Sequence, residues 1–154
     1  MNPPDIRPLR ADDLPALKRV IDATGLFPSE HLDDMVGDAP DRDGPELWLT
    51  AEDGGRPVAL AYCAPEPMTD GTWNLLLIAV HPSRQGRGIG AAAMRRVEDE
   101  LAARGARVLL VDTSALPGFA RTRAFYRGLG YDEEARIREY WAAGDDKVVF
   151  RKAL

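Results

Sequence analysis

The sequence predicts a single α+β domain, residues 1–154, with three or four helices on a mixed α/β sheet. Two apolar runs, 75–80 and 108–111, are short and bounded by turn residues, as strands buried on both faces are. Between them, residues 91–104 contain no Pro or Gly and are rich in strong helix formers. A strand, helix, strand order of this length implies a right-handed parallel crossover at the centre of the sheet.

The first third of the chain predicts one strand, two helices and a loop. Residues 6–10 form a plausible strand, and apolar residues then recur at helical spacing to about Ala23. A second, shorter helix opens at Pro28, and residues 38–45 form a polar loop containing Pro and Gly. We therefore expect two helices to precede most of the strands in the sequence.

The rest of the chain predicts further strand pairs and one more helix. The expected segments are a hairpin of strands 47–52 and 58–64 around Asp53-Gly54-Gly55, a loop at 65–71, a helix at 119–129, and a last pair of strands at 131–141 and 147–152 around residues 144–146. Together with the crossover, these elements predict a mixed sheet and no domain boundary.

Composition excludes several classes of protein. The net charge of −5 comes from mixed charges without a basic stripe, which argues against nucleic acid as a partner. No apolar run approaches the roughly 20 residues of a membrane span, and the N-terminus lacks the features of a signal peptide. With one cysteine and two histidines, neither a disulfide nor a zinc cluster is expected. We expect a cytoplasmic enzyme or binding protein without metal.

A glycine-rich turn follows the central strand. Gly86, Gly88 and Gly90 occupy every second position and lead directly into the predicted helix. Such a turn leaves backbone N–H groups free at a helix N-terminus, where the helix dipole favours an anion, most often phosphate. Arg84 and Arg87 add two cations on the same turn. The turn therefore predicts a phosphate-binding site, with a plain connecting turn as the simpler alternative.

The motif itself narrows the choice of ligand. A P-loop needs Gly-Lys-Ser/Thr, but Ala91 follows Gly90 here, and the spacing of the glycines does not fit the dinucleotide fingerprint. The run 85–90 instead resembles the Gln/Arg-x-x-Gly-x-Gly/Ala signature of the GNAT (Gcn5-related) N-acetyltransferase superfamily. Residues 122–131, which include Phe125-Tyr126, resemble a second motif of that family.

This resemblance implies a twisted, mostly antiparallel sheet of six to seven strands with about four helices. It also implies that the central parallel pair of strands splays to admit acetyl-CoA, that the loop holds the pyrophosphate, and that the backbone of residues 78–80 pairs with the pantetheine arm. The cofactor-binding residues it implies are Ile78, Ala79, Val80, Gln85, Gly86, Arg87, Gly88, Ile89, Gly90, Ala91, Ser114 and Tyr126.

The resemblance also implies catalytic roles. Tyr126 is the candidate general acid for the departing thiolate. Phe119 departs from the family pattern, because many relatives have Asn there to bind the pantetheine arm, and Ser114 is the candidate substitute. Some relatives use a Glu as general base where this chain has Asn74, so Asn74 would hold a water and Glu66 would accept the proton. Asp70 and a chain of waters are alternatives to Glu66.

The implied function is an acetyl-CoA-dependent N-acetyltransferase. It would transfer acetyl to a primary amine of a small molecule by direct attack in a ternary complex. Two alternatives stay open: a non-catalytic acyl-CoA binding module, and an N-acetyltransferase acting on a protein or peptide. Homodimers are common among such folds, and the sequence does not show whether this chain forms one.

Overall fold

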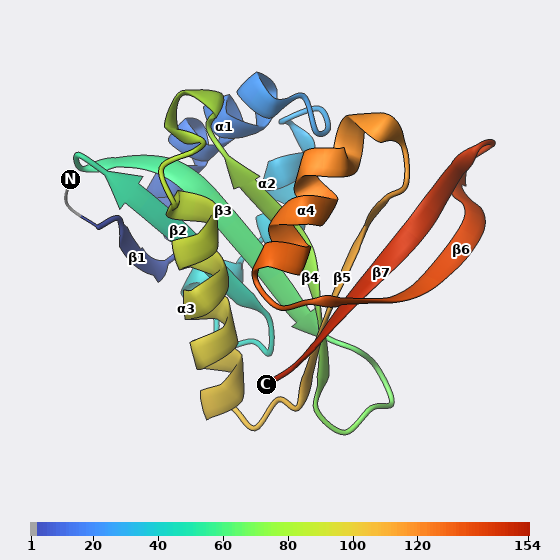
Figure 1. The fold of residues 1–154 in the computed structure, drawn as a ribbon. Helices are drawn as coiled ribbons and strands as arrows, with labels where there is room; N and C mark the ends of the chain where they lie inside the picture. Colours follow the sequence, from blue (N-terminus) through green and yellow to red (C-terminus); the bar gives the residue numbers. More distant parts are fainter. Residues whose placement is uncertain (1–2) are drawn as a thin grey trace. The chain divides into compact units, whose positions relative to one another are not determined.

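The computed structural model describes residues 3–154 and confirms the α+β class. Within this range the helices are α1 (Leu14–Thr24), α2 (His31–Val36), α3 (Ile89–Ala103) and α4 (Ala120–Gly128). The seven strands are β1 (Asp5–Pro8), β2 (Leu47–Asp53), β3 (Arg56–Pro65), β4 (Thr72–Val80), β5 (Val108–Ser114), β6 (Asp132–Ala142) and β7 (Asp145–Ala153) (Figure 1). They follow the order β1-β2-β3-β4-β5-β7-β6 in the sheet.

The chain divides into two compact units that share β4 and α3. The first unit comprises the chain up to Ala64 together with Leu77–Glu100, and the second comprises Pro65–Leu76 and Leu101–Leu154. We describe each unit separately. That residues 1–154 form one domain stays a prediction.

The first unit packs α1 and α2 against β2, β3 and the second half of β4. Its larger core combines apolar residues of these elements: Leu17, Val20, Ile21, Leu32, Val36, Trp48, Leu60, Leu77 and Ala79. A second cluster forms where Ile89 of α3 meets Ala51, Val58 and Ala59. These apolar faces are the ones that the helical and strand periodicities predict.

An ion pair closes the N-terminal part of the first unit. The Arg7 guanidinium donates to both carboxylate oxygens of Asp13 at 2.8 Å and also pairs with Glu52 of β2. The backbone N–H of Arg10 donates to Asp13 at 2.7 Å. Together these hydrogen bonds outweigh the burial of Asp13, which alone would raise its pKa, and hold that pKa below its usual value.

The second unit is the part of the sheet that contains the parallel pair. Residues 72–75 of β4 pair in parallel with 108–111 of β5, as the predicted crossover requires. β5 then pairs antiparallel with β7 from Val108↔Ala153 to Ser114↔Lys147, and β7 pairs with β6. α4 contributes Tyr126, which packs against the ring of Phe150 of β7.

Several local predictions differ from the structure. β1 ends at Pro8 rather than at residue 10, Asp53 belongs to β2, and residues 145 and 146 belong to β7 rather than to a turn. On α4, the helical spacing puts Phe125 and Leu129 on one face and predicts them as core residues, but both are half-buried and Tyr126 is the buried one. The cause is that Tyr131 and Phe150 both contact the Tyr126 ring, which the helical spacing alone does not reveal.

Candidate functional site

The glycine loop joins β4 to α3 in the first unit. A short 3-10 turn, Pro82–Arg84, follows β4, and α3 begins at Ile89. Gly86 and Gly88 have φ angles of 77° and 81°, in the left-handed region that favours glycine. The loop therefore needs glycine at these two positions for its backbone conformation.

The same glycines leave space above the loop. A Cβ built on Gly86 or Gly88 would meet no heavy atom within 4 Å. The first hydrogen bond of α3 runs from the Ala92 N–H to the Gly88 carbonyl at 2.9 Å. The N–H groups of residues 89–91 thus have no acceptor within the helix, as at any helix start. The loop is an exposed cradle of backbone donors and fits a phosphate group.

Two of the three polar side chains at residues 84, 85 and 87 already contact other protein groups. The Gln85 amide donates to the Val80 carbonyl at 3.1 Å, which folds the loop back on the end of β4. Arg84 lies 2.8 Å from Asp53 at the end of β2, so this cation is already paired. Arg87 is exposed, and no ion pair to it is found among residues 3–154. Of the two predicted cations, Arg87 is the one available to a ligand.

The last residues of β4 bury their side chains to different extents. Ala79 is buried in the larger core, while Ile78 and Val80 are half-buried, Val80 against the Ile89 cluster. Whether their backbone pairs with a pantetheine arm stays a prediction.

In the second unit, the structure brings together two of the predicted catalytic residues. Asn74 of β4 is only 7% exposed, and its Nδ2 donates to Oε1 of Glu66 at 3.0 Å. The same nitrogen donates to Oδ2 of Asp112 on β5 at 3.3 Å. By contrast, Asp70 is exposed, and its backbone carbonyl accepts a hydrogen bond from Arg107. The geometry thus favours Glu66 over Asp70 as the carboxylate associated with Asn74.

Asp112 and Lys147 complete this cluster and were missed in the sequence. Lys147 Nζ of β7 lies 3.0 Å from Asp112 Oδ2 and 4.2 Å from the centre of the Tyr140 ring. Burial would lower the Lys147 pKa, but the hydrogen bond and charge of Asp112 outweigh it and the pKa is raised. One signal was available, because Asp112 is the first charged residue after the buried run 108–111.

Tyr126 is buried at the centre of an aromatic group on α4. It is 3% exposed, and its ring centroid lies 5.2, 5.7 and 5.8 Å from those of Phe125, Phe150 and Tyr131. Packing fixes this side chain in one place, as both a core tyrosine and a general acid require. Its catalytic role stays a prediction.

Ser114 ends β5 and is engaged in local contacts. Its hydroxyl donates to Asp145 and accepts the Leu116 N–H at 3.1 Å. Arg123 of α4 donates to the Ser114 carbonyl at 2.8 Å and to that of Leu116 at 2.9 Å. These contacts are those of a strand-end cap, and the predicted bond from Ser114 to the cofactor stays untested.

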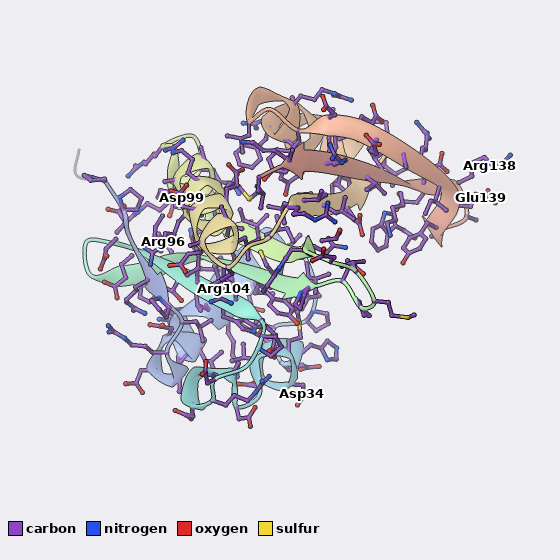
Figure 2. The ribbon with its side chains drawn as sticks, turned by 90° about the horizontal axis from the view of Figure 1, so that it is seen from below. Asp34, Arg96, Asp99, Arg104, Arg138 and Glu139 are labelled. Atoms are coloured by element: carbon purple, nitrogen blue, oxygen red, sulfur yellow. The ribbon has the colours of Figure 1, made fainter. Side chains whose placement is uncertain are left out.

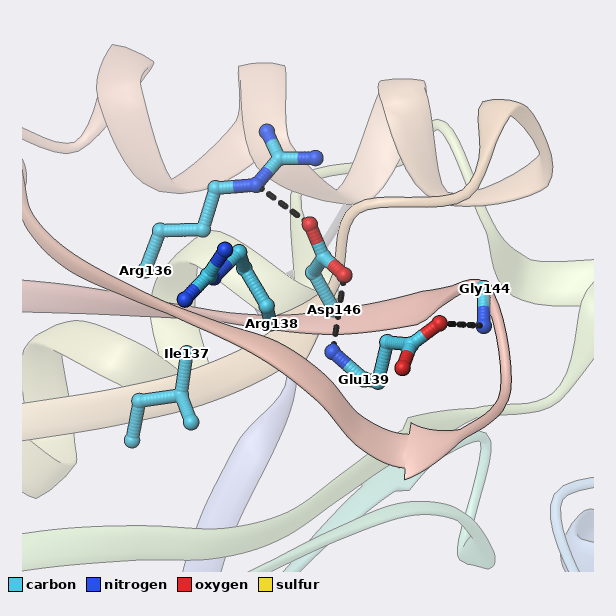
Figure 3. Close-up of a pocket in the computed structure, with 6 residues that line it drawn as sticks. All are labelled: Arg136, Ile137, Arg138, Glu139, Gly144 and Asp146. Atoms are coloured by element: carbon cyan, nitrogen blue, oxygen red, sulfur yellow. Dashed lines mark hydrogen bonds and ion pairs between the residues drawn. The ribbon is translucent and has the colours of Figure 1, made fainter.

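The hairpin of β6 and β7 carries a separate hollow of about 850 Å³ in the second unit. It is lined by Arg136, Ile137, Arg138, Glu139, Gly144 and Asp146 (Figure 3). Figure 2 shows Arg138 and Glu139 at the end of this hairpin. The Glu139 N–H and the Arg136 guanidinium both donate to Asp146 and lower its pKa, so the charges of Arg136 and Asp146 offset each other. The lining residues include none of the predicted site residues.

Residues 3–154 contain no candidate metal centre and no helix that could span a membrane. No group of three or more His, Cys, Asp or Glu residues in this range could hold a metal ion. In the same range, every helix is too short or too polar to cross a lipid bilayer.

Comparison with known proteins agrees with the fold. The model of the acetyltransferase (GNAT) family matches residues 11–131. A chloroplastic serotonin N-acetyltransferase 2 of Oryza sativa subsp. japonica is 37% identical over 90 residues, which cover 55% of this chain and 40% of that protein. The chain thus spans less than half the length of this curated relative.

Solved structures match nearly the whole chain. A protein from Desulfovibrio desulfuricans described as a GNAT acetyltransferase is 30% identical, with a TM-score of 0.89 over 97% of this chain and 98% of the other. A ribosomal-protein-alanine N-acetyltransferase from Brucella melitensis is 25% identical, with a TM-score of 0.80 over 97% and 99%. With the family model matching well over half of its residues, this chain belongs to the GNAT acetyltransferase family.

Proposed function

We propose that this protein transfers the acetyl group of acetyl-CoA to a primary amine of a small molecule, by direct attack in a ternary complex. Acetyl-CoA is the donor that GNAT enzymes use. The observation that carries the proposal is the loop at 85–91, where two glycines with positive φ and a helix start present backbone N–H groups with open space above them.

The loop residues would bind the donor through its pyrophosphate. N–H groups of residues 86–91 would donate to the phosphate oxygens, and the Arg87 guanidinium would add a cation at the exposed rim. Gln85 would hold the loop in place through its bond to the Val80 carbonyl. The donor supplies the acetyl group as a thioester.

Residues of the second unit would handle the protons. Glu66 would take a proton from the ammonium form of the acceptor, whose pKa near 10 otherwise keeps the nitrogen from attacking. The amine nitrogen then forms a bond to the acetyl carbon as the carbon–sulfur bond breaks, and the nitrogen releases its second proton to solvent, as Glu66 later does with the first. The Tyr126 hydroxyl would protonate the departing thiolate, and the phenolate would recover its proton from solvent. Asn74 supports this assignment, because its amide holds the Glu66 carboxylate at 3.0 Å.

The acceptor class is a proposal of its own. The rice relative is named for serotonin, a small amine, whereas the Brucella structure is named for an alanine of a ribosomal protein. We favour a small amine because the rice relative has the higher identity, 37% against 25%. A cytoplasmic location also stays a prediction.

Calorimetry with CoA, followed by a thiol-release assay with acetyl-CoA, tests the proposal. The acceptor panel should contain an arylalkylamine, a polyamine, an amino acid and a peptide with an N-terminal alanine. We expect CoA to bind and a small amine to be acetylated. Acetylation of the peptide alone would contradict the small-molecule assignment, and CoA binding without turnover of any acceptor would indicate a binding module.

A further inference from the structure

Four side chains of the second unit form a continuous chain of contacts that we call the Asn74 cluster. It consists of Glu66 in the loop before β4, Asn74 on β4, Asp112 on β5 and Lys147 on β7. The amide nitrogen of Asn74 lies 3.0 Å from the Glu66 carboxylate and 3.3 Å from that of Asp112. Lys147 lies 3.0 Å from the same Asp112 oxygen. Side chains from the loop, β4 and β5 therefore meet at one amide, and Lys147 of β7 joins them through Asp112.

The two carboxylates determine which way the Asn74 amide is turned. Its NH2 group has two hydrogens, and each carboxylate takes one of them. Its carbonyl oxygen is buried and has no hydrogen-bond partner among the described residues. The opposite orientation would set that oxygen against two negative charges. The observed orientation is therefore maintained by charge and leaves one buried acceptor unpaired, which is costly for a purely structural contact.

Lys147 makes this arrangement possible. Two carboxylates sharing one amide repel each other, and the ammonium of Lys147 offsets the charge of one of them. The side chains of Lys147 and Asp112 are only 15% and 17% exposed, so solvent screens the pair little. Asp112 is thereby kept as an acceptor for Asn74.

We propose that Asp112, held by Lys147, is a positioning residue that fixes the Asn74 amide and through it the Glu66 carboxylate. Glu66 is then presented in one orientation to the ammonium of the acceptor. Its part in proton transfer rests on the proposed function, whereas the control of the amide by Asp112 does not. Asp112 itself touches neither donor nor acceptor in this assignment.

A pair of variants separates positioning from simple loss of charge. In Asp112→Asn, Lys147 attracts the new carbonyl oxygen to the place of the shared Asp112 oxygen, so this oxygen still accepts from the Asn74 amide and only the charge is lost. In the double variant Asp112→Leu/Lys147→Met, no acceptor faces Asn74 on this side and no ammonium is left unpaired. The Asn74 amide is then free to turn. Glu133→Gln is the matched control, because it breaks the Arg127–Glu133 ion pair of the same unit.

Side-chain amide signals in a ¹⁵N–¹H NMR spectrum report the orientation directly. The chain contains two asparagines and one glutamine, so three NH2 pairs occur in the wild type, and Asn74→Asp and Gln85→Glu assign them. Asp112→Asn and Glu133→Gln each add one new pair. We expect the Asn74 pair to shift in Asp112→Leu/Lys147→Met and to stay near its original position in Asp112→Asn and Glu133→Gln. An Asn74 pair that the double variant leaves in place would overturn the proposal.

Kinetics of the same variants supply the second readout. We expect Asp112→Leu/Lys147→Met to lower kcat/KM for the acceptor at least tenfold with CoA affinity unchanged, and Asp112→Asn to keep most of it. An Asp112→Asn variant as impaired as the double variant would overturn the proposal. If the double variant does not fold, Asp112→Asn decides: wild-type-like Asn74 signals and activity support the proposal, and displaced signals overturn it. CoA should also shift the Gln85 pair; if it does not, the proposed function fails while the amide result stands.

Discussion

Replacing Gly88 by alanine tests the loop on which the proposed function depends. The substitution adds one methyl group at a residue with φ of 81°, where the added Cβ meets no protein atom within 4 Å. The free protein should therefore suffer only the backbone cost of a left-handed residue, about 1–2 kcal/mol of unfolding free energy. Any larger effect must appear when a ligand occupies the space above the loop.

The expected loss of affinity follows from one displaced hydrogen bond. A backbone N–H that donates to a phosphate oxygen contributes about 1.5–3 kcal/mol. If the methyl group moves one such donor out of range, the Kd for CoA should rise roughly ten- to hundredfold. Isothermal calorimetry with CoA at 25 °C measures this change, and urea unfolding measures the backbone cost separately.

Gly55 provides the matched control for this experiment. It lies in the turn between β2 and β3, has φ of 75°, and its Cβ would also meet nothing within 4 Å. Gly55→Ala should thus lower stability by a similar amount and leave the affinity for CoA unchanged. If Gly88→Ala binds CoA as tightly as Gly55→Ala does, the loop does not hold the donor and the reasoning is refuted.

Two other substitutions test the protonation chemistry and the N-terminal ion pair. Tyr126→Phe keeps the ring contacts with Tyr131 and Phe150, so we expect kcat to fall about a hundredfold or more with at most about 1.5 kcal/mol of unfolding free energy lost; a normal kcat in the thiol-release assay would exclude Tyr126 as the general acid. Asp13→Asn weakens the bonds from Arg7 that lower the Asp13 pKa. Because the folded pKa lies below the unfolded value of about 4, the carboxylate stabilises the fold above that pH, and this contribution disappears as the pH falls through the folded pKa. At pH 7, urea unfolding should therefore give Asp13→Asn an unfolding free energy about 1–3 kcal/mol below that of the wild type. This difference should become smaller toward pH 2. A difference that does not change with pH would contradict the assignment.

Most elements could be predicted because their signals are local. The apolar run ending at Val80, the glycines at 86 and 88 and the helix formers after them each restrict their own backbone, and the structure has β4, the loop and α3 there. The predictions that differed concern the ends of strands and the buried face of α4. Phe125 and Tyr126 are adjacent on α4, and only the positions of Tyr131 and Phe150 decide which of them is buried.

The sequence by itself determined the fold class, the family and the position of a glycine-rich turn before α3, because positive φ, strand runs and helix starts are properties of short segments. Only the tertiary structure decided that Arg84 is paired with Asp53 and that Asn74 joins Glu66 to Asp112. The tertiary structure also places Lys147 near Asp112. In the register of β5 and β7, Lys147 lies opposite Ser114, which is two residues beyond Asp112. The physical reason is that contacts across a sheet depend on the register of distant strands, which no short segment of the sequence specifies.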